Sequence, residues 1–230
     1  MGKQYVYSYK LTYFGGTAPC FDNDLLSLAI CKPVMRRVMG RAFKDDHDST
    51  YWFVGLVGKG LDDNRELGFS GRAGQILYLA KLTDVKDFAE YFSDPTYKSR
   101  KDHIYEECKE GSKNSFYSSG KYFRHVDRRV SEVHIDADSQ IKDWDVKFEE
   151  KYVLLSEQYY FPDQTMSDEI ISKLEEGQMF AGSRPHICFE TADDSPLIKE
   201  FESIVADPKN HGQNNLPVNF QNNCSKGCRR

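Results

Sequence analysis

The sequence predicts an α+β protein in which a mixed β-sheet is flanked by short helices. Strand-like and helical segments alternate along the whole chain. Hydrophobic residues make up 39% and charged residues 29% of the 230 residues, a composition typical of a globular protein with one core. Neither an internal repeat nor a clear linker is visible. We therefore expect a single domain over residues 1–215, followed by a flexible basic tail over 216–230.

The first half of the chain supplies the strands of the expected core. Residues 5–14 alternate as a strand does, with Tyr5, Tyr7 and Tyr9 on one face. Residues 23–29 fit either a short helix or an extended segment, and Pro33 favours a short helix over 33–38. The apolar segments 51–57 and 75–83 predict two buried strands, with a glycine-rich loop at 58–74 between them.

The second half of the chain predicts a different succession of helices, strands and irregular segments. Residues 84–92 have the apolar spacing of a helix, whereas 98–129 predict an irregular segment with nine basic residues against five acidic ones. A strand is predicted at 151–157, and helices are predicted at 168–176 and 195–205. The region 130–176 holds thirteen acidic and four basic residues, which predicts a separate acidic face.

Basic residues gather where the apolar run before Cys31 ends. The segment 28–44 carries five basic residues and no acidic one, although the chain has a formal net charge of −5. Lys32, Arg36 and Arg37 are candidate phosphate ligands, because a guanidinium fork and an ammonium both match phosphate and a helix begins here. The alternative is that the arginines pair with Asp45, Asp46 and Asp48 or are simply solvated.

Aromatic and basic residues elsewhere suggest further contacts to a nucleic acid. Tyr13 and Trp52 are candidates for stacking on a base, although most tyrosines of a strand belong to a core. Lys98, Arg100 and Lys101 follow an Asp-Pro turn and are candidates to clamp a phosphate backbone. An ordinary solvent-exposed loop explains the same residues equally well.

The sequence signals for catalysis are weaker than those for phosphate binding. Cys31 lies beside Lys32, which favours a lowered thiol pKa, and Asp102 with His103 would form an acid–base pair. No nucleophile elbow, phosphate loop or zinc signature accompanies them. Cys224 and Cys228 have the spacing of half a zinc site, yet no second pair of ligands stands out. We expect no metal and no cofactor, and free thiols at all six cysteines.

No segment resembles a membrane span or a targeting signal. The chain has no apolar run approaching eighteen residues, and its first residues alternate like a strand instead of forming the apolar stretch of a signal peptide. We therefore expect a cytoplasmic protein with no membrane partner.

Several segments together resemble the nucleotide-modification-associated domain 2 family. They are YSYKLTYFGGTAPCFDNDLLSLAICKPVMRR, YWFVGLVG, ILYLAKLTDVKDFAEYFSDPTY, KDHIYE, YVLLSEQYYFP and FAGSRPH. The Cys31-Lys32-Pro33 segment closed by Arg36-Arg37 is the most distinctive of these motifs. Because this family is associated with base-modifying enzymes in phages and bacteria, the resemblance implies a role in nucleotide modification. By analogy with the small PUA, ASCH, EVE and YTH barrels, it also implies a curved, partly closed sheet that reads modified bases.

Three functions follow from these observations. The first is a nucleic-acid or nucleotide binding protein that recognises a modified base, associated with DNA modification or phage defence. The second is an enzyme acting on modified nucleotides or bases, of hydrolase or glycosylase type. The third is an interaction module whose acidic region 130–176 docks a basic protein partner. Turnover of an oligonucleotide distinguishes the second from the first.

Overall fold

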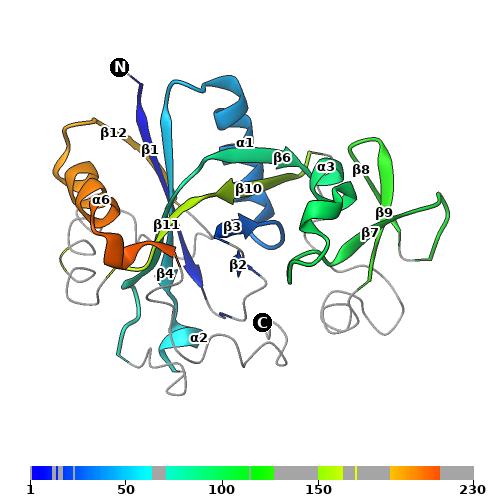
Figure 1. Cartoon of the computed structure of the whole chain (residues 1–230), viewed down its shortest axis with the longest axis horizontal. Coiled ribbons are helices and arrows are strands. Elements are labelled where there is room, and N and C mark those ends of the chain that lie inside the picture. Colours follow the sequence, from blue (N-terminus) through cyan, green and yellow to red (C-terminus); the bar gives the residue numbers. More distant parts are fainter. Residues whose placement is uncertain are drawn as a thin grey trace.

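The computed structural model describes residues 2–11, 14, 18–22, 24–63, 71–113, 115–126, 150–162, 169 and 187–212. Within them, strands and short helices alternate, so the predicted α+β class is confirmed (Figure 1). The strands form three sheets of five, four and three strands.

The five-stranded sheet has the order β11-β5-β4-β1-β12. Its strands are β11 (Gln158–Tyr160), β5 (Ile76–Lys81), β4 (Thr50–Val57), β1 (Gln4–Leu11) and β12 (Ile187–Thr191). β1 and β4 run parallel in register from Gln4 opposite Thr50 to Leu11 opposite Val57, and every other neighbouring pair is antiparallel. Helix α6 (Pro196–Ala206) covers one face of this sheet, where Phe201 packs on Trp52 at a ring distance of 5.4 Å. The Ser195 hydroxyl caps α6 by accepting from the Ile198 amide.

The four-stranded sheet has the order β2-β3-β10-β6 and is antiparallel throughout. Its strands are β2 (Cys20–Asp22), β3 (Leu25–Leu28), β10 (Tyr152–Ser156) and β6 (Asp84–Asp87). Helix α1 (Pro33–Asp45) joins the first two sheets and packs against β10. Met35 and Met39, four residues apart on one face of α1, are fully buried in the largest core cluster. That cluster also contains Tyr7 and Tyr9 of β1 and Tyr78 of β5, so the predicted tyrosine face of β1 points into the core.

The three-stranded sheet lies at the opposite end of the molecule from α6 (Figure 1). It consists of β7 (Tyr105–Cys108), β9 (Lys121–His125) and β8 (Phe116–Ser118), in the order β7-β9-β8. Helix α3 (Phe88–Ser93) packs on one face of this sheet. The rings of Phe88 and Phe92 there meet Tyr105, Phe116 and Phe123. Three short elements complete the described fold: α2 (Lys59–Asp62), η2 (Pro95–Tyr97) and η4 (Pro208–Asn210).

The expected partly closed, PUA-like barrel is not confirmed. In the described residues no sheet closes on itself, and β11 and β12 remain edge strands of the largest one. Strand identity follows from local apolar patterns, whereas the pairing of β1 with β4 and β12 depends on contacts between segments far apart in the chain.

Three predicted elements differ from the structure. Residues 84–92 form strand β6 followed by helix α3, because Asp87 and Glu90 make a capping box that starts the helix at Phe88. The segment 98–129, predicted to be irregular, contains β7, β8 and β9. Helix α1 continues past the predicted end at Val38 to Asp45. The predicted helix 168–176 except Glu169, most of the acidic region 130–176 and the predicted tail 216–230 lie outside the described residues.

Candidate functional site

The chain turns sharply between β3 and α1 at Cys31 and Lys32. Both residues have left-handed backbone conformations, with φ of 61° at Cys31 and 49° at Lys32. For residues with a Cβ this conformation costs about 1–2 kcal/mol each, and such strain persists only where the surroundings enforce it. Pro33 then occupies the first turn of α1, where its fixed φ suits a helix and its missing N–H is not needed.

The side chain of Arg36 fixes this turn from inside. Its guanidinium is 1% exposed, its Nε donates to the Cys31 carbonyl at 2.7 Å and its Nη1 donates to the Tyr152 carbonyl at 2.5 Å. One side chain therefore links the strained turn to the first residue of β10. Arg36 acts from the interior, and its two charge-assisted bonds support the conformation of Cys31 and Lys32.

Lys32 is half-buried at this corner. Its Nζ lies 5.3 Å from the centroid of the Tyr9 ring, a cation–π contact, and the Tyr9 hydroxyl shares a 2.5 Å hydrogen bond with the Tyr78 hydroxyl. Burial lowers the pKa of Lys32, an effect opposed by the electrostatic interaction with the neighbouring Cys31. Burial likewise raises the pKa of Tyr9 and of Tyr78, so both phenols stay neutral. Among the described residues, no carboxylate forms an ion pair with Lys32.

The start of α1 adds to this positive corner. No side chain caps the helix at Lys32, and its first turn contains no acidic residue. The N-terminus of a helix carries a partial positive charge and N–H groups that favour an anion. Lys32 and the first turn of α1 therefore present positive charge at the same place, which we term the α1 corner (Cys31, Lys32, Pro33 and Val34).

The third predicted phosphate ligand, Arg37, interacts with the Glu150 carboxyl. Arg37 is half-buried on α1 and, with Arg41, lowers the pKa of the Glu150 carboxyl; the hydrogen bond from Arg41 is the larger cause. Lys44, farther along the same helix, pairs with Asp87 at 2.8 Å. The predicted cationic cluster is therefore divided. Arg36 lies in the interior, Lys32 lies at the α1 corner, and Arg37 lies on the side of the helix.

Of the two predicted stacking residues, the structure describes only Trp52. Trp52 is 3% exposed beneath α6, and its Nε1 donates to Gln4 Oε1 at 2.8 Å. Such a buried indole contributes to the core of the five-stranded sheet. Tyr13 lies outside the described residues.

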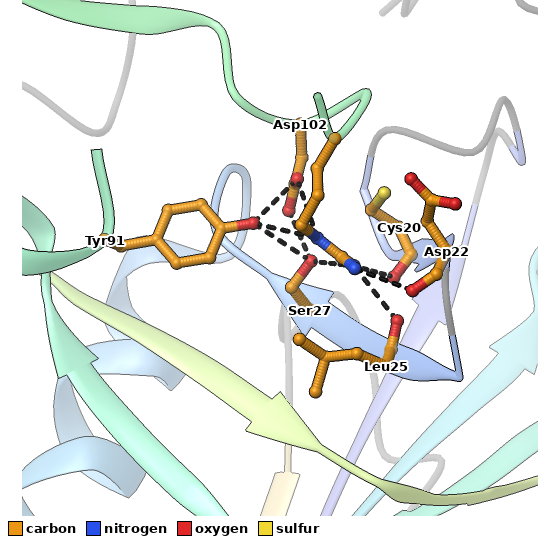
Figure 2. Close-up of polar contacts among 7 residues, drawn as sticks. Cys20, Asp22, Leu25, Ser27, Tyr91 and Asp102 are labelled. Atoms are coloured by element: carbon orange, nitrogen blue, oxygen red, sulfur yellow. Dashed lines mark hydrogen bonds and ion pairs between the residues drawn. The ribbon is translucent and has the colours of Figure 1, made fainter. Parts of the chain in front are cut away.

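Arg100 and Asp102 belong to a buried network that holds the β2–β3 hairpin (Figure 2). The guanidinium of Arg100 donates to the carbonyls of Asp22, Cys20 and Leu25 at 2.7–3.2 Å and to the Ser27 hydroxyl at 2.7 Å. The Asp102 carboxylate accepts from Ser27 at 2.5 Å and from the Tyr91 hydroxyl at 2.8 Å. Because Arg100 is 5% and Asp102 0% exposed, this network stabilises the hairpin from within.

The remaining candidates surround this network. Lys98 and Lys101 are exposed on the connection between η2 and β7. The His103 ring packs on Phe92 at 5.2 Å, and burial lowers its pKa. Asp102 therefore bonds with Ser27 and Tyr91 while the adjacent His103 contacts an aromatic cluster. No three His, Cys, Asp or Glu side chains in the described ranges gather as a metal site.

Sequence reasoning missed two residues that lie beneath the α1 corner. Tyr78 lies 69 residues from Tyr9 in the chain and approaches it only because β5 pairs with β4 next to β1. Gly55, on β4, leaves room for the Tyr78 ring, since a Cβ at Gly55 would lie 2.1 Å from Tyr78 Cε1. A lone glycine inside an apolar strand is the one local signal of this close approach.

An α+β fold with a cationic corner at a helix start is compatible with proteins that bind anionic ligands. The family model for nucleotide modification associated domain 2 matches residues 3–224, so the chain belongs to that family. Its place in nucleotide modification systems follows from this membership. No curated protein and no solved structure matches the chain. Among the described residues, none of the helices combines the length and the apolar character needed to cross a membrane.

Proposed function

We propose that this protein binds a nucleotide or nucleic acid through a phosphate group at the α1 corner. The observation that carries the proposal is Lys32, a half-buried ammonium without a carboxylate partner among the described residues, at a helix start that no side chain caps. A phosphate in this place meets a point charge and the positive end of the helix dipole together. Membership of the nucleotide modification family supports a nucleotide as the source of that phosphate.

The energetics of the half-buried Lys32 ammonium favour the binding of an anion from solvent. Burial removes water from the Lys32 ammonium, and the Tyr9 ring replaces only part of that solvation. A phosphate oxygen at the ammonium supplies a full negative charge and a strong hydrogen bond in return. The Arg36 clamp holds the corner in this conformation before any ligand arrives, which reduces the entropy lost on binding.

The proposal extends to recognition of a modified base, in a role connected with DNA modification or phage defence. Family membership supports this extension. Trp52 packs beneath α6 and belongs to the core. We therefore assign the phosphate contact to Lys32 and no ligand contact to Trp52. A single-stranded or flipped base suits such recognition, because a base inside a duplex hides its faces.

Calorimetric titration with nucleoside 5′-monophosphates, plain and base-modified, tests this proposal. Lys32→Asn removes the charge but tolerates the left-handed conformation, and it should weaken binding by about tenfold or more. Lys32→Arg should retain most of the affinity. The control is Lys199→Gln, which removes an equal charge from the exposed face of α6 and should bind like the wild type. Equal affinity of Lys32→Asn and Lys199→Gln would reject the α1 corner as the phosphate site.

One observation also favours the enzymatic alternative. Cys31 combines a left-handed backbone, partial exposure and a position beside Lys32 at the start of α1. Positive charge and a helix start both stabilise a thiolate, which is the nucleophilic form of cysteine. Mass spectrometry of an oligonucleotide with modified bases after incubation separates the two functions. A changed mass that is lost in Cys31→Ser supports an enzyme, whereas an unchanged mass supports a binding protein.

A further inference from the structure

The three-stranded sheet has one face that the core does not use. Its inner face supplies Phe116 and Phe123 to the cluster around α3, and its outer face carries Tyr117 and Tyr122, which lie opposite each other in register. Tyr117 is 57% exposed, more than any other large hydrophobic side chain of the described residues. Its ring meets the Tyr122 ring at 5.4 Å and 65°. The pair is thus a small aromatic surface open to solvent.

Packing does not account for Tyr117. A tyrosine that stabilises a core buries its ring and finds a partner for its hydroxyl, as Tyr91 does with Asp102. The Tyr117 hydroxyl forms no hydrogen bond within the described residues. Tyr122, in contrast, donates its hydroxyl to Glu110 Oε1 at 2.9 Å, and this bond raises the pKa of Tyr122. That contact holds the Tyr122 ring in place and brings Glu110, on the connection between β7 and β8, beside the aromatic pair.

The chain segment that contains the pair has a positive net charge. Residues 98–126 contain seven Lys or Arg against four Asp or Glu, in a chain whose formal net charge is −5. Each of the four carboxylates already has a partner: Ser27 and Tyr91 for Asp102, Arg124 for Glu106, Lys121 for Glu107 and Tyr122 for Glu110.

Two lysines on the β7–β8 connection remain without such a partner. Lys109 directly follows Cys108, which lies opposite Tyr122, and Lys113 is in the same connection. Both are exposed and form no ion pair within the described part of the chain. Lys109 and Lys113 therefore contribute positive charge to the same connection that places the Glu110 carboxylate at Tyr122.

We propose that Tyr117 and Tyr122, with Lys109 and Lys113, form a contact surface for single-stranded nucleic acid. Tyr117 stacks on an unpaired base, and the two lysines meet backbone phosphates. The occupant is single-stranded because only unpaired bases expose their faces to an aromatic ring. This inference rests on the proposed function and extends it, since the α1 corner takes one phosphate while the outer face of the three-stranded sheet follows a longer strand.

The test is fluorescence anisotropy of the full chain with a labelled single-stranded oligonucleotide and its duplex, across a salt titration. Tyr117→Ala should weaken single-strand binding by about 5- to 100-fold, whereas Tyr117→Phe and Tyr117→Trp should retain it. Lys113→Gln should reduce the salt dependence by about 0.7 in slope, the value for one phosphate of a single strand. The matched control is Val38→Ala, an exposed apolar truncation on α1, which should leave affinity unchanged.

The outcomes separate this inference from the proposed function. Unchanged single-strand affinity in Tyr117→Ala would overturn the inference, and so would an equal loss for single strand and duplex. Absence of oligonucleotide binding at low salt would overturn it as well and leave the outer face to a protein partner. In each of these cases, the affinity of Lys32→Asn for nucleoside monophosphates tests the α1 corner separately. Tyr117→Ala should not change the affinity for nucleoside monophosphates.

Discussion

The Nε of Arg36 donates a 2.7 Å hydrogen bond to the carbonyl of Cys31, five residues earlier in the chain. This bond crosses from the first turn of α1 back to a residue in the left-handed region. The most distinctive motif of the sequence, Cys31-Lys32-Pro33 followed by Arg36, is therefore one structural unit. The buried arginine determines the backbone of the turn, and the turn determines where the Lys32 ammonium lies.

We expect Arg36→Met to destabilise the protein. The substitution leaves the carbonyls of Cys31 and Tyr152 buried without their donor, and the loss should be about 3 kcal/mol in the free energy of unfolding. Arg36→Lys should not restore it, because one ammonium cannot reproduce the planar fork. Urea denaturation gives the comparison. Arg41→Met, which removes the exposed pair with Glu150, is the control and should have a much smaller effect. Equal losses in the two variants would contradict the clamp.

Close packing beneath the α1 corner predicts that Gly55→Ala is harmful. A Cβ at Gly55 would meet the Tyr78 ring at 2.1 and 2.5 Å, so the ring must shift. Overpacking of this kind costs about 1–3 kcal/mol. In a Tyr78→Leu background, Gly55→Ala should lower the free energy of unfolding by less than it does in the wild type. Denaturation measures both losses. A full, additive loss in the double variant would show that the Tyr78 ring is not the obstacle.

The lowered pKa of Lys32 predicts how nucleotide affinity depends on pH. The ammonium must be protonated to bind phosphate, and burial makes it lose its proton below the usual pKa of 10.5. Wild-type affinity should therefore decline as the pH rises toward that value, while Lys32→Arg stays charged and keeps its affinity. Titrations at several alkaline pH values compare the two proteins. Parallel profiles would mean that Lys32 does not hold the ligand.

His103 predicts a loss of stability in mild acid. Burial lowers its pKa below 6.5 in the folded state, so on acidification the unfolded chain takes up this proton first. The free energy of unfolding should fall as the pH drops below about 6.5, and the fall should be smaller in His103→Gln. Urea midpoints at pH 7 and pH 5 test this. His47→Gln serves as the control, and an identical pH dependence in both variants would exclude His103 as the source.

The sequence alone determined the kinds of element and the most distinctive motif. Alternating and apolar segments correctly predicted β1, β4, β5 and β10, and the spacing before Asp207-Pro208 correctly predicted α6. These predictions succeed because strand and helix periodicity is local. The prediction of a single helix over 84–92 was wrong for a local reason too, because the Asp87–Glu90 capping box competes with a helix that would start at Asp84.

Only the tertiary structure decided which charged and aromatic residues face solvent. Arg36 and Arg100 read as candidate phosphate ligands in the sequence, yet each lies inside the protein and donates to carbonyls of distant strands. Trp52 lies beneath α6, whereas Tyr117 is exposed on a segment that local patterns predict to be irregular. Composition fixes how many such side chains a chain has. Whether a guanidinium or a ring is buried depends on long-range strand pairing, which brings its partners together and which no local pattern encodes.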